Sequence, residues 1–201
     1  MKTISYDKDY IFEIIHDLKA PVLSMDFALK NIKRNEFLDE IYKINKHNLN
    51  YIENMTLEYS IKKGRYELKE EITDLIKIIN EEIKPLNFII KEKNLRIIKS
   101  YDKVETTEIK SDERLIRQII LNLLTNSIKY SPDNENIKII LETKNNSIEI
   151  SFENKINKEL KNFSSTKIGL EIVKNKIKAL KGKFKAEKTL NTVKSTVLFP
   201  L

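Results

Sequence analysis

The residues near the N-terminus with the greatest capacity for chemistry form the sequence HDLKAP, from His16 to Pro21. With an ordinary pKa near ~6.5, the imidazole of His16 is largely neutral at neutral pH and can act as a nucleophile. Asp17 can orient the ring or accept its proton, and Lys19 adds a positive charge nearby. Pro21 has no backbone N–H, so a helix here should bend or loosen beside the histidine. The spacing allows a reactive imidazole or an ordinary surface histidine.

Apolar residues around this motif recur at helical spacing. The first series steps by four and three residues along Ile11, Ile15, Leu18, Val22, Met25, Leu29 and Ile32. A second series runs from Phe37 to Met55. These heptad seams predict two long helices joined by a short polar turn. Because one hairpin cannot bury both flanks of its seams, we expect two copies to form a homodimeric four-helix bundle, with Ile15 and Leu18 pointing inward and His16 outward.

Composition limits the class of protein. The 201 residues include no cysteine, which excludes a disulfide framework and a thiolate metal site, and we assign no metal ligands. No apolar run approaches the roughly 20 residues of a membrane span, so we expect a cytoplasmic protein without membrane contact. The net charge of +7 comes mainly from lysine, which favours a solvated surface, or one that attracts an acidic protein, over a nucleic-acid site.

The heptad spacing of apolar residues ends before Gly64, and helix and strand patterns alternate after it. This change predicts a hairpin domain over residues 1–64 and a second domain over 65–201. In the second domain we expect helices over residues 70–94 with a break at Pro85, over 111–132 with Ser111 or Asp112 as N-cap, and over 168–182 ended by Gly182. Strands are expected over 95–101, 106–110, 135–145, 146–154, 183–190 and 195–201, with a turn at Asn145 and Asn146. This order predicts an α+β fold with helices on one face of a mixed sheet.

Several of these segments resemble two-component sensor histidine kinases. HDLKAP looks like their H-box, and DERLIRQIILNLLTNSIKYSP resembles their N-box. The N-box positions are Gln118, Asn122, Asn126, Lys129 and Tyr130. The closing GKFKAEKTL and STVLFPL are similar to the last hairpin of the kinases' ATPase domain, so the resemblance covers nearly the whole chain. It implies that His16 is the phosphorylated residue, that Asp17 assists it and that the hairpin dimerises. His47 lies in no motif.

The glycines depart from this family's pattern. The family's ATP site uses two glycine-rich loops, whereas this chain has only Gly64, Gly169 and Gly182. Glu153 stands where the adenine-reading Asp is expected and Lys155 where the first loop glycine is expected, and the second loop keeps only Gly169. The sequence therefore predicts that ATP binding is lost and that Asn122, Asn126, Lys129 and Tyr130 are vestigial.

A second departure is Ala20, since many sensor kinases carry Thr or Asn four residues after the histidine to position the water that dephosphorylates their partner. Alanine has no side-chain group that could hold such a water, so we do not expect phosphatase activity by that route.

The resulting hypothesis is a bacterial histidine phosphotransferase that relays phosphate between receiver-domain aspartates of response regulators through His16. In this hypothesis Lys19 would supply a positive charge near His16, and Phe12 and Ile15 would form part of the docking surface for the receiver. The partner receiver would supply the Mg²⁺, and the protein itself would hold no tightly bound cofactor. Two alternatives stay open. One is an ATP-dependent histidine kinase with a divergent ATP site, and the other is a non-catalytic dimeric regulator of a kinase or response regulator.

Overall fold

The computed structural model describes residues 8–32, 35–156 and 167–201. The chain divides into two compact units, Met1–Tyr66 and Glu67–Leu201. The division falls beside Gly64, the residue at which the sequence predicts the domain boundary.

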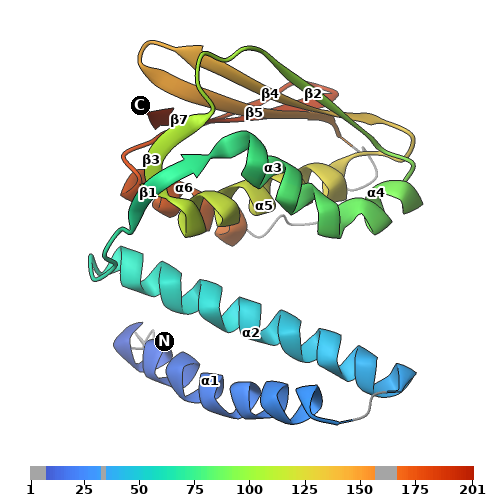
Figure 1. The fold of residues 1–201 in the computed structure, drawn as a ribbon, viewed down its shortest axis with the longest axis vertical. Helices are drawn as coiled ribbons and strands as arrows, with labels where there is room; N and C mark the ends of the chain where they lie inside the picture. Colours follow the sequence, from blue (N-terminus) through green and yellow to red (C-terminus); the bar gives the residue numbers. More distant parts are fainter. Residues whose placement is uncertain (1–7, 33–34, 157–166) are drawn as a thin grey trace, which may run out of the picture. The chain divides into compact units, whose positions relative to one another are not determined.

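The first unit is a helical hairpin of α1 (Lys8–Lys30) and α2 (Glu36–Lys62), which lie side by side in opposite directions (Figure 1). Asn35 begins α2 as its N-cap, because its side chain accepts a hydrogen bond from the N–H of Leu38 at 2.9 Å. Gly64 ends it in the left-handed conformation, with φ of 65°. The two predicted helices and their end at Gly64 are confirmed.

The hairpin buries only part of its apolar seams. Leu29 of α1 and Leu49 and Ile52 of α2 are buried, as is Asn45, whose side-chain amide donates to the carbonyl of Val22 at 3.2 Å. In contrast, three expected seam residues are about half exposed: Leu18 at 50%, Met25 at 50% and Ile32 at 51%. A single hairpin therefore leaves one apolar flank uncovered, and the dimeric four-helix bundle stays a prediction.

The second unit is an α+β domain, as the sequence predicts. Its main sheet has the strand order β2-β4-β5-β7-β6, in which β2 and β4 are parallel and the other neighbours antiparallel. The strands are β2 (Arg96–Lys103), β4 (Asn136–Lys144), β5 (Ser147–Lys155), β6 (Lys183–Lys188) and β7 (Thr192–Pro200). The helices α3 (Leu75–Ile83), α5 (Glu113–Tyr130) and α6 (Lys167–Ala179) cover one face of this sheet (Figure 1).

The expectation of one interrupted helix over residues 70–94 is wrong in its first part. Glu70–Asp74 forms strand β1, which pairs with β3 (Glu108–Asp112) in a separate two-stranded sheet. Asp74 then caps α3, since its carboxylate accepts from the N–H of Lys77 at 3.1 Å. The break at Pro85 is confirmed, because a short 3₁₀ turn (Lys84–Leu86) separates α3 from α4 (Asn87–Glu92).

Gly182 has a different role from the one expected. Helix α6 ends at Ala179, and it is Lys181 that adopts the left-handed conformation, with φ of 56°. Gly182 follows, and its N–H donates to the carbonyl of Ile177 at 2.9 Å. A Cβ on Gly182 would lie 2.6 Å from the carbonyl oxygen of Leu198, so this glycine permits the helix end to approach strand β7.

Candidate functional site

The H-box residues lie in α1. His16 is helical, but its side chain falls outside the described part of the chain, as do those of Phe12 in α1 and His47 in α2. Around it, Asp17 and Ala20 are exposed, whereas Ile15 and Lys19 are half-buried. Pro21 lies inside the helix, as expected. The roles of His16, Asp17 and Lys19 remain predictions.

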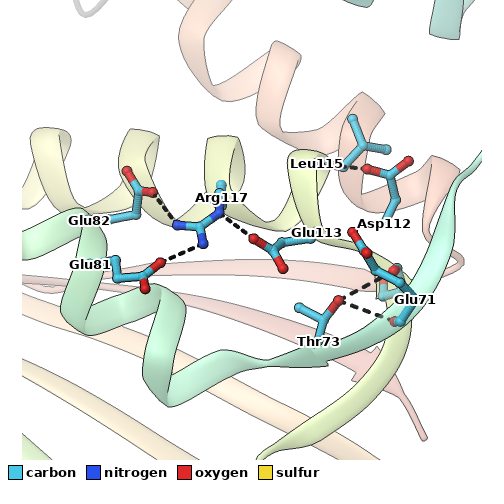
Figure 2. A network of polar contacts seen from close by, with 9 residues as sticks. Glu71, Thr73, Glu81, Glu82, Asp112, Glu113, Leu115 and Arg117 are labelled. Atoms are coloured by element: carbon cyan, nitrogen blue, oxygen red, sulfur yellow. Dashed lines mark hydrogen bonds and ion pairs between the residues drawn. The ribbon is translucent and has the colours of Figure 1, made fainter.

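Helix α5, which carries the N-box residues, is fixed at its N-terminus by the buried carboxylate of Asp112. One oxygen of Asp112 accepts from the N–H of Leu115 at 3.1 Å, which makes Asp112 rather than Ser111 the N-cap (Figure 2). The other oxygen accepts from the N–H of Lys69 at 2.9 Å. Because Lys69 follows the end of α2 by only a few residues, a single side chain joins the entry segment of the domain to the start of α5.

One turn further, Arg117 joins α5 to α3. Its guanidinium donates to Glu113 at 2.7 Å, to Glu82 at 3.0 Å and to Glu81 at 2.5 Å (Figure 2). Burial lowers the pKa of Arg117, but the hydrogen bonds to Glu81, Glu113 and Glu82 outweigh it and leave that pKa above its usual range. The hydrogen bond from Arg117 in turn lowers the pKa of Glu81. These bonds set the position of α5 along α3.

The C-terminus of α5 is held by Lys93, from the turn between α4 and β2. Its ammonium donates to the carbonyls of Ile128 at 2.9 Å and Ser131 at 2.6 Å. A cation at this end also complements the partial negative charge of the helix terminus. Sequence reasoning did not identify Lys93 or Arg117, because the contacts of Lys93 with the end of α5 and of Arg117 with α3 do not follow from local spacing.

The N-box side chains form a polar stripe on this fixed helix. Gln118, Asn122 and Asn126 recur every four residues, so they share one face of α5, and all three are half-buried. The amide of Asn122 donates to the backbone carbonyl of Gln118 at 2.8 Å. The side-chain oxygen of Gln118 is buried and accepts no hydrogen bond from the described residues. Lys129 is exposed, and its ammonium lies 5.4 Å from the ring centroid of half-buried Tyr130.

Strand β5 determines which face of the sheet bears Glu153, the expected adenine-reading position. Its alternate residues Ile148, Ile150 and Phe152 are buried on the face that the helices cover, and Asn154 continues this row with only 5% exposure. Glu153 and Lys155 therefore lie on the opposite face. There the carboxylate of Glu153 is 3.4 Å from the ammonium of Lys138, and the ammonium of Lys155 is 2.8 Å from Glu135. The polar side chain on the helix-covered face is that of Asn154, not that of Glu153.

Asn154 was missed, although the sequence carries the signal for it. From Ile148 to Asn154 apolar and polar residues alternate, and the strand period of two assigns Asn154 to the apolar face. Asn154 pairs with Ile137 near the start of β4, shortly after α5 ends at Tyr130. The ends of β5 and α5 therefore meet at the same edge of the domain.

Gly169, the glycine kept from the second loop, lies near the start of α6, and its surroundings fall outside the described residues. Within the described ranges, no group of three or more His, Asp or Glu side chains could hold a metal ion. None of the described helices is long and apolar enough to cross a membrane.

Comparisons with known proteins connect this domain with sensor kinases. Residues 111–201 match the family model described as histidine kinase-, DNA gyrase B-, and HSP90-like ATPase. The chain is 26% identical to the heme sensor protein HssS of Staphylococcus saprophyticus over 129 residues, which cover 61% of this chain and 27% of HssS. It is 26% identical to the adaptive-response sensory kinase SasA of Prochlorococcus marinus over 149 residues, which cover 72% of this chain and 40% of SasA. The chain thus spans less than half the length of these relatives.

Solved structures of histidine kinases share the fold. The catalytic domain of histidine kinase ThkA is 26% identical, with a TM-score of 0.56 over 67% of this chain and 96% of that one. Full-length ShkA in complex with AMPPNP has a TM-score of 0.75 at 17% identity, covering 97% of this chain and 46% of ShkA. ThkA in complex with response regulator protein TrrA has a TM-score of 0.58 at 24% identity, covering 96% of this chain and 60% of that one. The chain is therefore similar to sensor histidine kinases, and its residues 111–201 resemble their ATPase domain.

Proposed function

We propose that this protein is an ATP-dependent histidine kinase with a divergent nucleotide site, in which His16 receives the phosphoryl group. The similarity to HssS and SasA supports this function, which the sequence alone left as an alternative, over the phosphorelay hypothesis. The polar stripe on α5 supports it too, because Gln118, Asn122 and Asn126 are held on a helix that is fixed at both ends.

The observation that carries the proposal is the orientation of the side chains at the end of β5. The loss of ATP binding was expected because Glu153 and Lys155 replace the Asp and glycine of the family's first loop. Both side chains point to the sheet face that the helices do not cover, where Lys138 and Glu135 bind them. Neither side chain therefore fills the helix-covered side of this strand, where Asn154 offers a polar group to a ligand.

The chemistry is a single phosphoryl transfer. An imidazole nitrogen of His16 forms a bond to the γ-phosphorus of ATP while the bond from that phosphorus to the β–γ bridging oxygen breaks, and ADP leaves. The proton of the attacking imidazole passes to Asp17 or to water. Asn122 and Asn126 would hold a Mg²⁺ ion, which when bound neutralises phosphate charge. The contacts of Asp112, Arg117 and Lys93 keep the helix that bears these amides in place.

Incubation of the full chain with γ-labelled ATP and Mg²⁺ tests the proposal. We expect acid-labile label on the wild type and on His47→Ala, and none on His16→Ala. A wild-type chain that takes no label from ATP would contradict the kinase proposal. His47→Ala is the matched control because it removes the other imidazole of the chain.

The phosphorelay remains the second candidate, favoured by the scarcity of glycine. Only Gly169 lies in the region of the family's two loops, and Ala20 gives no hydroxyl or amide one turn after His16. In this function a neutral His16 attacks the phospho-aspartate of a receiver whose own site supplies Mg²⁺, and a second receiver takes the phosphate on. The complex of ThkA with TrrA supports a response-regulator receiver as the partner of either function. Label that reaches His16 from a phosphorylated receiver, but not from ATP, would identify the relay.

We also propose that the working unit is a homodimer formed through the hairpin. The uncovered flank of Leu18, Met25 and Ile32 supports this assembly, because a second hairpin would remove it from water.

A further inference from the structure

The side of α1 that faces α2 differs from the apolar seam expected from the sequence. Among the described side chains of α1, those that are not exposed recur by four and three residues: Ile15, Lys19, Val22, Asp26 and Leu29. This spacing defines one helix face, which lies toward α2 because the two helices pack side by side (Figure 1). Lys19 thus takes the place of Leu18 in the seam, and Asp26 takes the place of Met25.

The difference corresponds to a rotation of α1 about its own axis by about 40°, given the residue spacing of a helix. In the observed setting Leu18 and Met25 are each 50% exposed, whereas Asp26 is only 5% exposed. Apolar burial within a single hairpin would favour the other setting, with Leu18 and Met25 against α2. A polar contact therefore has to favour the observed setting in the single chain.

Asn45 of α2 supplies a contact of this kind. It is 3% exposed, and its side-chain amide donates to the carbonyl of Val22 in α1 at 3.2 Å. A rotation by 40° would displace the backbone of α1 by about 1.5 Å, because helix Cα atoms lie roughly 2.3 Å from the axis. A hydrogen bond of this length breaks under such a displacement unless the donor follows, and a closely packed side chain such as Asn45 is not free to follow.

We infer that Asn45 sets the rotation of α1 on α2 and so keeps the flank of Leu18, Met25 and Ile32 turned outward for a second copy of this chain; this inference rests on the homodimer proposed above. In packed helices a single buried Asn can select one register and one assembly at a cost in stability. Here that cost is the apolar burial that the single hairpin forgoes. The same flank of a second hairpin restores this burial, since each copy presents the same apolar surface.

Asn45→Leu tests the inference, because leucine has a similar volume but cannot donate a hydrogen bond. The carbonyl of Val22 keeps its partner within the helix, the N–H of Asp26, so the substitution leaves no buried polar group without a bond. Loss of one neutral hydrogen bond shifts the balance between the two settings, and both chains of a dimer must adopt the competent one. We expect the dimer dissociation constant of the full chain, measured by sedimentation equilibrium, to rise by about tenfold.

Hydrogen exchange of the α1 and α2 amides in the dilute chain supplies a second measurement. A purely stabilising role of Asn45 would make exchange faster in Asn45→Leu. We expect exchange there to be unchanged or slower while the dimer weakens, because leucine replaces a buried amide. Asn45→Ala, which removes the amide without adding apolar volume, should weaken the dimer in the same direction.

Ser24→Ala is the matched control. It removes a hydrogen bond from the Oγ of Ser24 to the carbonyl of Ala20, at 3.0 Å, which lies within α1 and does not join the two helices. This variant should keep the dissociation constant of the wild type. Circular dichroism checks that each variant is folded.

The outcomes separate this inference from the assembly on which it rests. A wild-type chain that stays monomeric would overturn both the homodimer and the role of Asn45. A wild-type dimer whose dissociation constant is the same in folded Asn45→Leu would overturn only the role of Asn45, as would a weaker dimer with faster exchange in that variant. A weaker dimer with undiminished protection of the hairpin in Asn45→Leu, and an unchanged dimer in Ser24→Ala, supports it.

Discussion

The two units of the chain bury their apolar residues to very different extents. In the described part of the hairpin, four large apolar side chains are buried and eight are exposed. The α+β domain buries most large apolar residues of α5 and of the helix-covered face of the sheet, and its exposed ones, such as Ile72, Phe88 and Ile98, are few for its size. The domain is therefore complete by itself, whereas the hairpin has an apolar surface that requires a partner.

The largest effect on stability is expected in the core of the complete domain. Leu124 of α5 is 0% exposed, so Leu124→Ala removes buried methyl groups and leaves a cavity. We expect the free energy of unfolding of the domain to fall by about 2–5 kcal/mol. Urea unfolding of the full chain, followed by circular dichroism, measures it. Leu190→Ala is the control, because Leu190 is 92% exposed, and a comparable loss in this variant would contradict the distinction between core and surface.

Substitutions of Asp112 should lower the free energy of unfolding by a smaller amount. The contributions of its hydrogen bonds from Leu115 and from Lys69 can be measured separately. Asp112→Ala removes both the cap of α5 and the bond to Lys69, and we expect a loss of about 2 kcal/mol. Asp112→Asn keeps an acceptor for the N–H of Leu115 but places an amide against the N–H of Lys69. It should lose about half as much stability and increase hydrogen exchange at Lys69 specifically. Equal protection of Lys69 in both proteins would show that the bond to the entry segment does not hold that segment.

Arg117 should show a weaker, pH-dependent effect. Arg117→Met is expected to cost about 1 kcal/mol at neutral pH, since these ion pairs are partly exposed and screened. The pKa of Glu81 is lowered in the folded chain, so its contribution is present above the ordinary pKa near 4.5 and is lost as pH falls through the folded value.

Thermal unfolding between pH 3 and 7 measures the effect of Arg117, and the wild type should lose more stability on acidification than Arg117→Met. Lys185→Met, which breaks an exposed pair with Glu187, is the matched control and should change little. Parallel pH curves for the wild type and Arg117→Met would contradict the role of Arg117.

Local patterns predicted most of the fold, and the misses share one cause. The long helices, the N-cap of α5 and the turn at Asn145 and Asn146 follow from residues within a few positions of each other. Strand β1 was missed because it forms through pairing with β3, about 40 residues away, and that pairing overrides the weak local preference of Glu70–Asp74.

The site was predicted less completely than the fold. Successive residues of a strand point to opposite faces of the sheet, and sequence reasoning did not use this to place Glu153 on one face and Asn154 on the other. The bonds of Arg117 and Lys93 join segments that only the tertiary fold brings together, and no local spacing predicts them.

Substitutions on the uncovered flank of the hairpin test directly whether this flank binds a second hairpin. Met25→Lys combined with Ile32→Lys changes two half-exposed side chains, so the stability of the separate chain should change little. If a second hairpin covers this flank, each lysine must be buried or displaced there, and the dimer dissociation constant should rise by more than about tenfold.

Sedimentation equilibrium of the full chain measures this constant. The control is Phe88→Lys in α4, an apolar residue that is even more exposed but lies in the other unit. A dimer that is weakened by Phe88→Lys and not by the pair in the hairpin would assign the association to the α+β domain. A wild-type chain that stays monomeric at high concentration would contradict the homodimer, although Leu18, Met25 and Ile32 are about half exposed in the single chain.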